Sequence, residues 1–77
     1  MNSIDNLIEL LKKRAFHSTE EANNHDKSFF DLLKKGDFDK STQENLKFCR
    51  LTIEAATYFE ILEEVKKLKT NMEKKHD

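Results

Sequence analysis

A single glycine near the middle of an otherwise uninterrupted chain is the feature that most restricts the fold. The 77 residues contain no proline, and their only glycine is Gly36. Glycine and proline mark most turns, so a sheet that needs several tight turns is disfavoured and long helices on either side of Gly36 are favoured. A chain of this length has room for one domain with a small core. The sequence therefore predicts a single all-α domain over residues 1–77.

The residues around Gly36 predict a helix end followed closely by a helix start. Two lysines precede Gly36, where positive charge stabilises a helix C-terminus, and glycine readily takes the left-handed conformation that ends many helices. Five residues later, Ser41 and Glu44 match a capping box, in which each side chain accepts a hydrogen bond from the other residue's backbone amide. We therefore expect a helical arm over about residues 3–35, a turn over 36–40 and a second arm over about 41–74.

Two apolar stripes, spaced alternately by three and four residues, run along the two predicted arms. This is the spacing of the contact seam of a coiled coil. The first stripe comprises Ile4, Ile8, Leu11, Ala15, Ser18, Ala22, His25, Phe29 and Leu32. The second comprises Phe48, Leu51, Ala55, Tyr58, Leu62, Val65, Lys69 and Met72. The predicted fold is a long antiparallel helical hairpin, in which a turn over 36–40 sets Phe29 against Phe48 and Ala22 against Ala55.

The first arm has an alternative conformation with a kink near Ser18. Ser18 and Glu21 match a second capping box, and residues 17–28 carry few apolar side chains. A break there would divide the arm into helices over 3–16 and 18–35 and give a three-helix arrangement. The unbroken hairpin is the favoured prediction, and the kinked arm is kept as the alternative.

The turn also resembles the beginning of a calcium-binding loop. Asp37, Asp39 and Ser41 have the spacing of the first three oxygen ligands, but Thr42 stands where glycine is required and Phe48 where glutamate is required. The pattern fails at its most specific positions. We therefore interpret this stretch as a turn with helix caps.

No other arrangement of residues favours a metal site or an enzyme. His17, Glu21 and His25 recur every four residues and so share one helix face, but no fourth ligand accompanies them. Cys49 has no base nearby in the predicted hairpin to activate it as a nucleophile. The prediction is a protein without catalytic residues, bound metal or cofactor.

The charges nearly cancel over the whole chain, with 14 basic and 15 acidic residues. No overall field therefore directs the protein towards DNA or an anionic membrane. One local exception is a cluster of basic residues expected near the open end of the hairpin, comprising Lys12, Lys13, Arg14, Lys66, Lys67 and Lys69. Binding of nucleic acid or of an acidic surface through this cluster is an alternative function.

The cellular location is predicted from the cysteine and from the absence of apolar runs. Cys49 is the only cysteine, so no disulfide can form within the chain, and a reducing compartment is favoured. The start of the chain lacks the pattern of a signal peptide, and no apolar run reaches the roughly 18 residues that span a bilayer. We expect a cytoplasmic protein.

The second arm carries more apolar residues than one seam can bury. A helix that is apolar on two opposite sides is normally buried on both. In a two-helix hairpin, the first helix covers only one side of the second. The residues expected to bind a partner are Phe30, Leu46, Cys49, Ile53, Ala56 and Phe59. The partner is either another helical protein or a second copy, which would make a four-helix-bundle regulator, inhibitor or immunity protein.

The segments LLKKGDFDKSTQENLKF and TIEAATYFEILEEV together carry a resemblance to one family. Their pattern of a hairpin turn followed by a helix rich in alanine and aliphatic residues resembles the small co-chaperones of type III secretion needle subunits. The resemblance implies a helical hairpin that pairs with a larger helical-repeat chaperone and keeps the needle subunit from polymerising in the cytoplasm.

Overall fold

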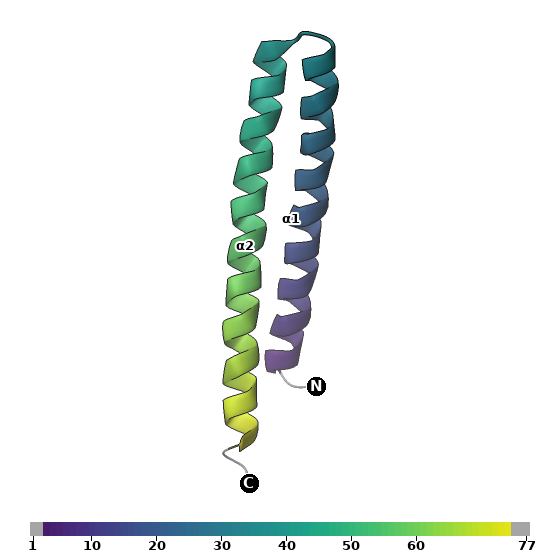
Figure 1. Ribbon diagram of the computed structural model, residues 1–77. Coiled ribbons are helices and arrows are strands. Elements are labelled where there is room, and N and C mark those ends of the chain that lie inside the picture. The colour runs from purple at the N-terminus through teal and green to yellow at the C-terminus, as the bar shows by residue number, and fades with distance from the viewer. Residues whose placement is uncertain (1–2, 75–77) are drawn as a thin grey trace.

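The computed structural model describes residues 3–74, which fold into two antiparallel helices joined by a tight turn (Figure 1). Helix α1 spans Ser3–Lys34 and helix α2 spans Phe38–Lys74. The two helices lie side by side along a molecule of 62 × 18 × 12 Å. The predicted all-α hairpin is confirmed. No helix among the described residues is long and apolar enough to cross a membrane.

Helix α1 continues without a break through the position of the predicted kink, so the three-helix alternative is wrong. Ser18 does not cap a new helix; it is buried, and its hydroxyl lies 3.4 Å from Oε1 of Glu54 on α2, to which it donates. The adjacent Thr19 hydroxyl donates to the carbonyl oxygen of Ala15 at 2.8 Å. Both polar side chains are therefore satisfied inside a continuous helix, as small hydroxyl residues can be.

The turn is built as the residues around Gly36 predict. Gly36 has a φ of 80°, the left-handed conformation. Its amide donates to the carbonyl oxygen of Leu33, and the Asp37 amide donates to that of Leu32, both at 3.0 Å. This pair of hydrogen bonds is the Schellman arrangement, which satisfies the last carbonyl groups of a helix. Gly36 therefore ends α1 and reverses the chain.

The second helix begins at Phe38, three residues before the predicted start, so the capping box of Ser41 and Glu44 is wrong. Asp37 caps the helix instead, because its Oδ1 accepts a hydrogen bond from the Lys40 amide at 3.2 Å. Aspartate caps a helix as well as serine does. The Ser41 hydroxyl donates to the Phe38 carbonyl oxygen within the first turn. The linker is therefore shorter than predicted.

The two predicted seams face each other and form the core. The buried apolar residues belong to them without exception among residues 3–74: Ile8, Leu11, Ala15, Ala22, Leu51, Ala55 and Leu62. Towards the open end, Ile8, Leu11 and Leu62 form an apolar cluster flanked by Ile4, Tyr58 and Val65. The seam nearer the turn contains the buried Leu51 together with alanine, serine, histidine and partly buried leucine and phenylalanine.

The pairing of the two seams differs from the predicted one by roughly one helical turn. The predicted pairing, in which Ala22 faces Ala55, also sets Ser18 level with Phe59. In the structure Ser18 contacts Glu54 instead. At the open end, Lys69 Nζ lies 2.6 Å from Asp5 Oδ1, whereas the predicted pairing sets Lys69 against Ile8. The shorter linker is the cause, because α2 starts three residues earlier and every residue of α2 is displaced relative to α1.

Replacing Gly36 by alanine is expected to lower the free energy of unfolding by about 1–2 kcal/mol, because a Cβ atom disfavours the left-handed conformation. No atom lies within 4 Å of where that Cβ would stand, so backbone strain alone is tested. Urea unfolding measures the loss, and Gly36→Asn is the matched control, since asparagine tolerates this conformation better. Equal stability of the alanine variant and the wild type would contradict the required positive φ.

Candidate interaction surface

Four residues of α2 form an exposed apolar stripe on the side that faces away from α1. Leu46, Cys49, Ile53 and Ala56 follow one another at intervals of three, four and three residues, which places them on one helix face. The residues between them that point to α1, Leu51 and Ala55, are buried. Leu46 is 64% exposed and Ile53 67% exposed. We call these four residues the outer stripe.

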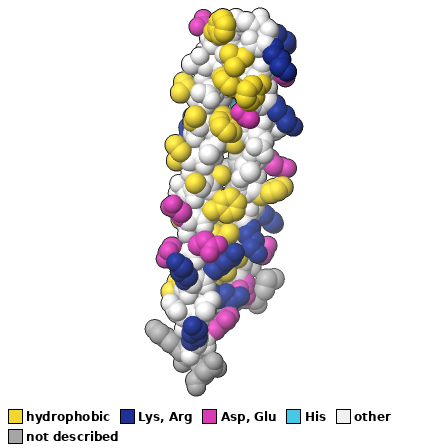
Figure 2. Space-filling model, viewed as in Figure 1, with side chains coloured by type: hydrophobic (Ala, Val, Ile, Leu, Met, Phe, Trp, Pro, Cys, Tyr) yellow, Lys and Arg dark blue, Asp and Glu magenta, His cyan; other side chains and the backbone are white. Residues whose placement is uncertain are grey.

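The two predicted aromatic residues lie outside the outer stripe, Phe59 next to it on α2 and Phe30 on α1. Phe59 follows Ala56 by three residues and is 48% exposed. Phe30 is on α1, is 53% exposed, and packs edge to face on Phe29 with ring centroids 5.2 Å apart. Figure 2 shows hydrophobic side chains gathered over the half of one face nearest the turn, on both helices, with more charged side chains towards the open end. The structure thus exposes all six predicted partner-binding residues, on two helices.

One exposed aromatic residue next to this surface escaped the sequence prediction. Phe38 is 67% exposed and is the first residue of α2. It lies three heptads before Phe59, so the two rings share one side of the helix. It was missed because the predicted turn extended to residue 40 and assigned no face to Phe38. Recognising Asp37 as the helix cap would have included it.

The seam contains one polar pair that joins the helices near the turn. His25 Nδ1 of α1 pairs with Glu44 Oε2 of α2, and both side chains are partly buried. Lys47 Nζ lies 3.8 Å from the other carboxylate oxygen of Glu44. The hydrogen bond to His25 is the main reason why the pKa of Glu44 is lowered from its ordinary value of 4.5. His25 thus has a side-chain partner from the other helix within the seam.

Acidification is expected to weaken the hairpin partly through Glu44. Because the pKa of Glu44 is lower in the folded state, its contribution to stability is present above pH 4.5 and is lost as the pH falls through the folded-state pKa. Thermal melts of the wild type and of Glu44→Gln between pH 3 and pH 7 measure this contribution. The difference in melting temperature between the two proteins should shrink at acid pH, and a constant difference would contradict the role of the carboxylate.

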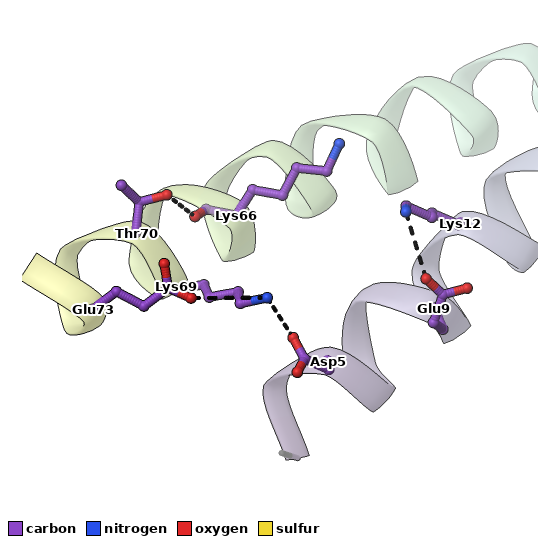
Figure 3. Close-up of polar contacts among 7 residues, drawn as sticks. All are labelled: Asp5, Glu9, Lys12, Lys66, Lys69, Thr70 and Glu73. Atoms are coloured by element: carbon purple, nitrogen blue, oxygen red, sulfur yellow. Dashed lines mark hydrogen bonds and ion pairs between the residues drawn. The ribbon is translucent and has the colours of Figure 1, made fainter. Parts of the chain in front are cut away.

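The basic residues at the open end lie among acidic ones (Figure 3). Lys69 links the two helices, because its Nζ lies 2.6 Å from Oδ1 of Asp5 on α1. The same Nζ lies 3.9 Å from Oε1 of Glu73. The hydrogen bond to Asp5 is the main cause that raises the pKa of Lys69. Nζ of Lys12 lies 3.5 Å from Oε1 of Glu9, which is on the same helix. These exposed pairs contribute little to stability, but they place negative charge beside each of these ammonium groups.

The other members of the predicted basic cluster also lie near acidic side chains. Nζ of Lys66 lies 3.7 Å from Oε1 of Glu63, and Nζ of Lys67 lies 3.5 Å from Oε1 of Glu64. The remaining two, Lys13 and Arg14, line a shallow hollow together with His17, Ser18, Glu54 and Tyr58. The six residues therefore do not present a uniform row of positive charge for phosphates. Nucleic-acid binding stays a prediction that this geometry does not strengthen.

The histidine trio considered as a metal site is divided by the fold. His17 Nε2 lies 3.0 Å from Glu21 Oε1, whereas His25 turns to Glu44 on the other helix. Over residues 3–74, no three side chains of histidine, cysteine, aspartate or glutamate are grouped closely enough to hold a metal ion.

The fold and this surface define a class, a two-helix hairpin whose longer helix is apolar on both its inner and its outer side. Comparisons of the chain with protein-family models, with curated proteins and with solved structures give no match.

Proposed function

We propose that this protein is a small helical binding module that docks a helix of a partner on the outer stripe of α2. The observation that carries the proposal is that α2 has an apolar face on each side, and α1 covers only one of them. Ile53 and Leu46 are about two-thirds exposed, at 67% and 64%, although they repeat with the same spacing as the buried seam. A helix face with this pattern is what an apolar groove or a facing helix recognises.

The chemistry of the hairpin supports binding in preference to catalysis. The partly buried polar pair of His25 and Glu44 joins the two helices to each other, and it lies in the seam and not on the outer stripe. The apolar side chains exposed beside the stripe, among them Phe38 and Phe59, resemble the aromatic anchors that dominate protein interfaces.

The most specific form of the proposal is a cytoplasmic co-chaperone that pairs with a larger helical chaperone around a secretion-apparatus subunit. Its support is the resemblance carried by residues 32–48 and 52–65, together with a hairpin architecture of the kind that the resemblance implies. The single exposed thiol of Cys49 is compatible with a reducing compartment.

Affinity capture from extracts of the native host tests the proposal with a pair of matched variants. Ile53→Asp places a charge in the outer stripe, and Leu68→Asp places the same charge on an exposed leucine of α2 beyond it, at 55% exposure. Proteins retained by the wild type and by Leu68→Asp should be lost from Ile53→Asp, by at least about tenfold in recovered amount. Equal recovery with both variants would refute docking on the outer stripe.

A further inference from the structure

We propose that the partner of the outer stripe is a second copy of the chain, packed α2 against α2 in antiparallel orientation about a twofold axis. The inference rests on the proposed function, because it names the occupant of the same surface. Twofold dimers are the commonest homo-oligomers, and their interfaces pair one surface patch with itself. The outer stripe must therefore be complementary in shape to a second copy of itself. This can be checked from the sizes of its four side chains.

The stripe is complementary to itself only when the two helices run in opposite directions. An axis level with Leu51 sets Leu46 of one copy against Ala56 of the other, and Ile53 against Cys49. Each layer then combines one large with one small side chain, so the helices can approach closely and fill space evenly. A parallel pair would set Leu46 against Leu46 and Ala56 against Ala56, crowding one layer and leaving another hollow.

Three threonines that border the stripe already have their hydroxyl groups hydrogen-bonded within α2. The hydroxyl groups of Thr42, Thr52 and Thr57 donate to the carbonyl oxygens of Phe38, Phe48 and Ile53, at 2.9, 2.8 and 2.9 Å. Covering a polar group is costly mainly when it is left without a hydrogen bond. These threonines keep their hydrogen bonds when a second helix covers them.

Charged residues are sparse along the same part of α2. Of the twelve exposed residues between 42 and 57, three are charged, whereas seven of the twelve exposed residues between 60 and 74 are charged. The core of a protein interface is depleted of charge in this way. The pairing does bring Arg50 near Arg50 of the second copy, so added salt, which screens their repulsion, is expected to strengthen the dimer.

The exposed apolar area is sufficient for a small stable dimer. Phe38, Leu46, Ile53 and Phe59 are 67%, 64%, 67% and 48% exposed. The antiparallel pairing sets Phe59 of one copy level with Gln43 of the other, and Phe38 level with Glu64, so the two rings extend the apolar surface beyond the outer stripe. Two copies then contribute about 700 Å² of apolar side-chain area from these residues. Because roughly 60% of an interface is apolar, the whole interface is about 1,200 Å², the lower end of the range for specific complexes.

Sedimentation velocity and thermal melting over about a hundredfold range of concentration test the dimer, because a dimer melts at a higher temperature when it is more concentrated. Wild type and Leu68→Asp should sediment as dimers, and Ile53→Asp should weaken association by at least about tenfold. A short bismaleimide should link two wild-type chains through Cys49, the only thiol, and should link Ile53→Asp far less.

The result that overturns the inference is a wild type that sediments as a monomer with a melting temperature independent of concentration. A dimer that survives Ile53→Asp also overturns it, because association would then use another surface. A monomer that still captures a host protein through the outer stripe refutes the second copy and leaves the binding module standing. A monomer whose capture is unaffected by Ile53→Asp refutes both proposals.

Discussion

Replacing Leu62 by alanine is expected to remove a large part of the stability of the hairpin. Leu62 is 3% exposed and packs with Ile8 and Leu11 in the largest apolar cluster of the described residues. Truncating a buried leucine to alanine costs about 2–5 kcal/mol, and small domains are stable by about 5–15 kcal/mol in total. The variant should unfold in a broad transition, or lack a folded baseline, in circular dichroism melts at 25 °C and above.

Leu68→Ala is the matched control for this prediction. Leu68 lies six residues later on the same helix and is 55% exposed, so its truncation should change the stability by no more than about 0.5 kcal/mol. If the two variants lost similar stability, the apolar cluster at the open end would not be the main support of the fold.

Enlarging Ala15 to leucine is expected to have the second largest effect. Ala15 is completely buried, at 0% exposure, and it lies where α1 approaches α2. Additional methyl groups at a well-packed contact force the helices apart and cost about 1–3 kcal/mol. The midpoint of urea unfolding should fall accordingly.

Glu20→Leu introduces the same side chain at an exposed position of α1 and provides the control. Its stability should stay within about 0.5 kcal/mol of the wild type. A stabilised Ala15→Leu variant would mean that the contact contains unfilled space. The small size of Ala15 would then not be needed for the close approach of the two helices.

The helices and their buried faces could be predicted because they depend on local patterns. The spacing of Ile8, Leu11 and Ala15 defines one face of a helix whatever lies opposite, so the seams were found from each arm separately. The outer stripe follows from the same reasoning, since Leu46 and Ile53 repeat with the seam but on the other side of α2.

The pairing of the helices could not be predicted as well, because it depends on the number of residues in the turn. Asp37 and Ser41 are both good helix caps, and the sequence alone does not rank two caps four residues apart. The choice of Ser41 also assigned Glu44 to a capping box. Its actual contact with His25 crosses the hairpin and therefore became visible only once the pairing was known.

The position of the aliphatic cluster determines the order in which the hairpin can form. The contact between His25 and Glu44 near the turn closes a short loop of chain and costs little entropy, but this contact is polar. The contact of Ile8 with Leu62 belongs to the apolar cluster of the core and closes the much longer loop between residues 8 and 62. Pairing that starts at the turn therefore gains the burial of this cluster only when the segments around Ile8 and Leu62 meet, so we expect the helices to become ordered together as one cooperative unit.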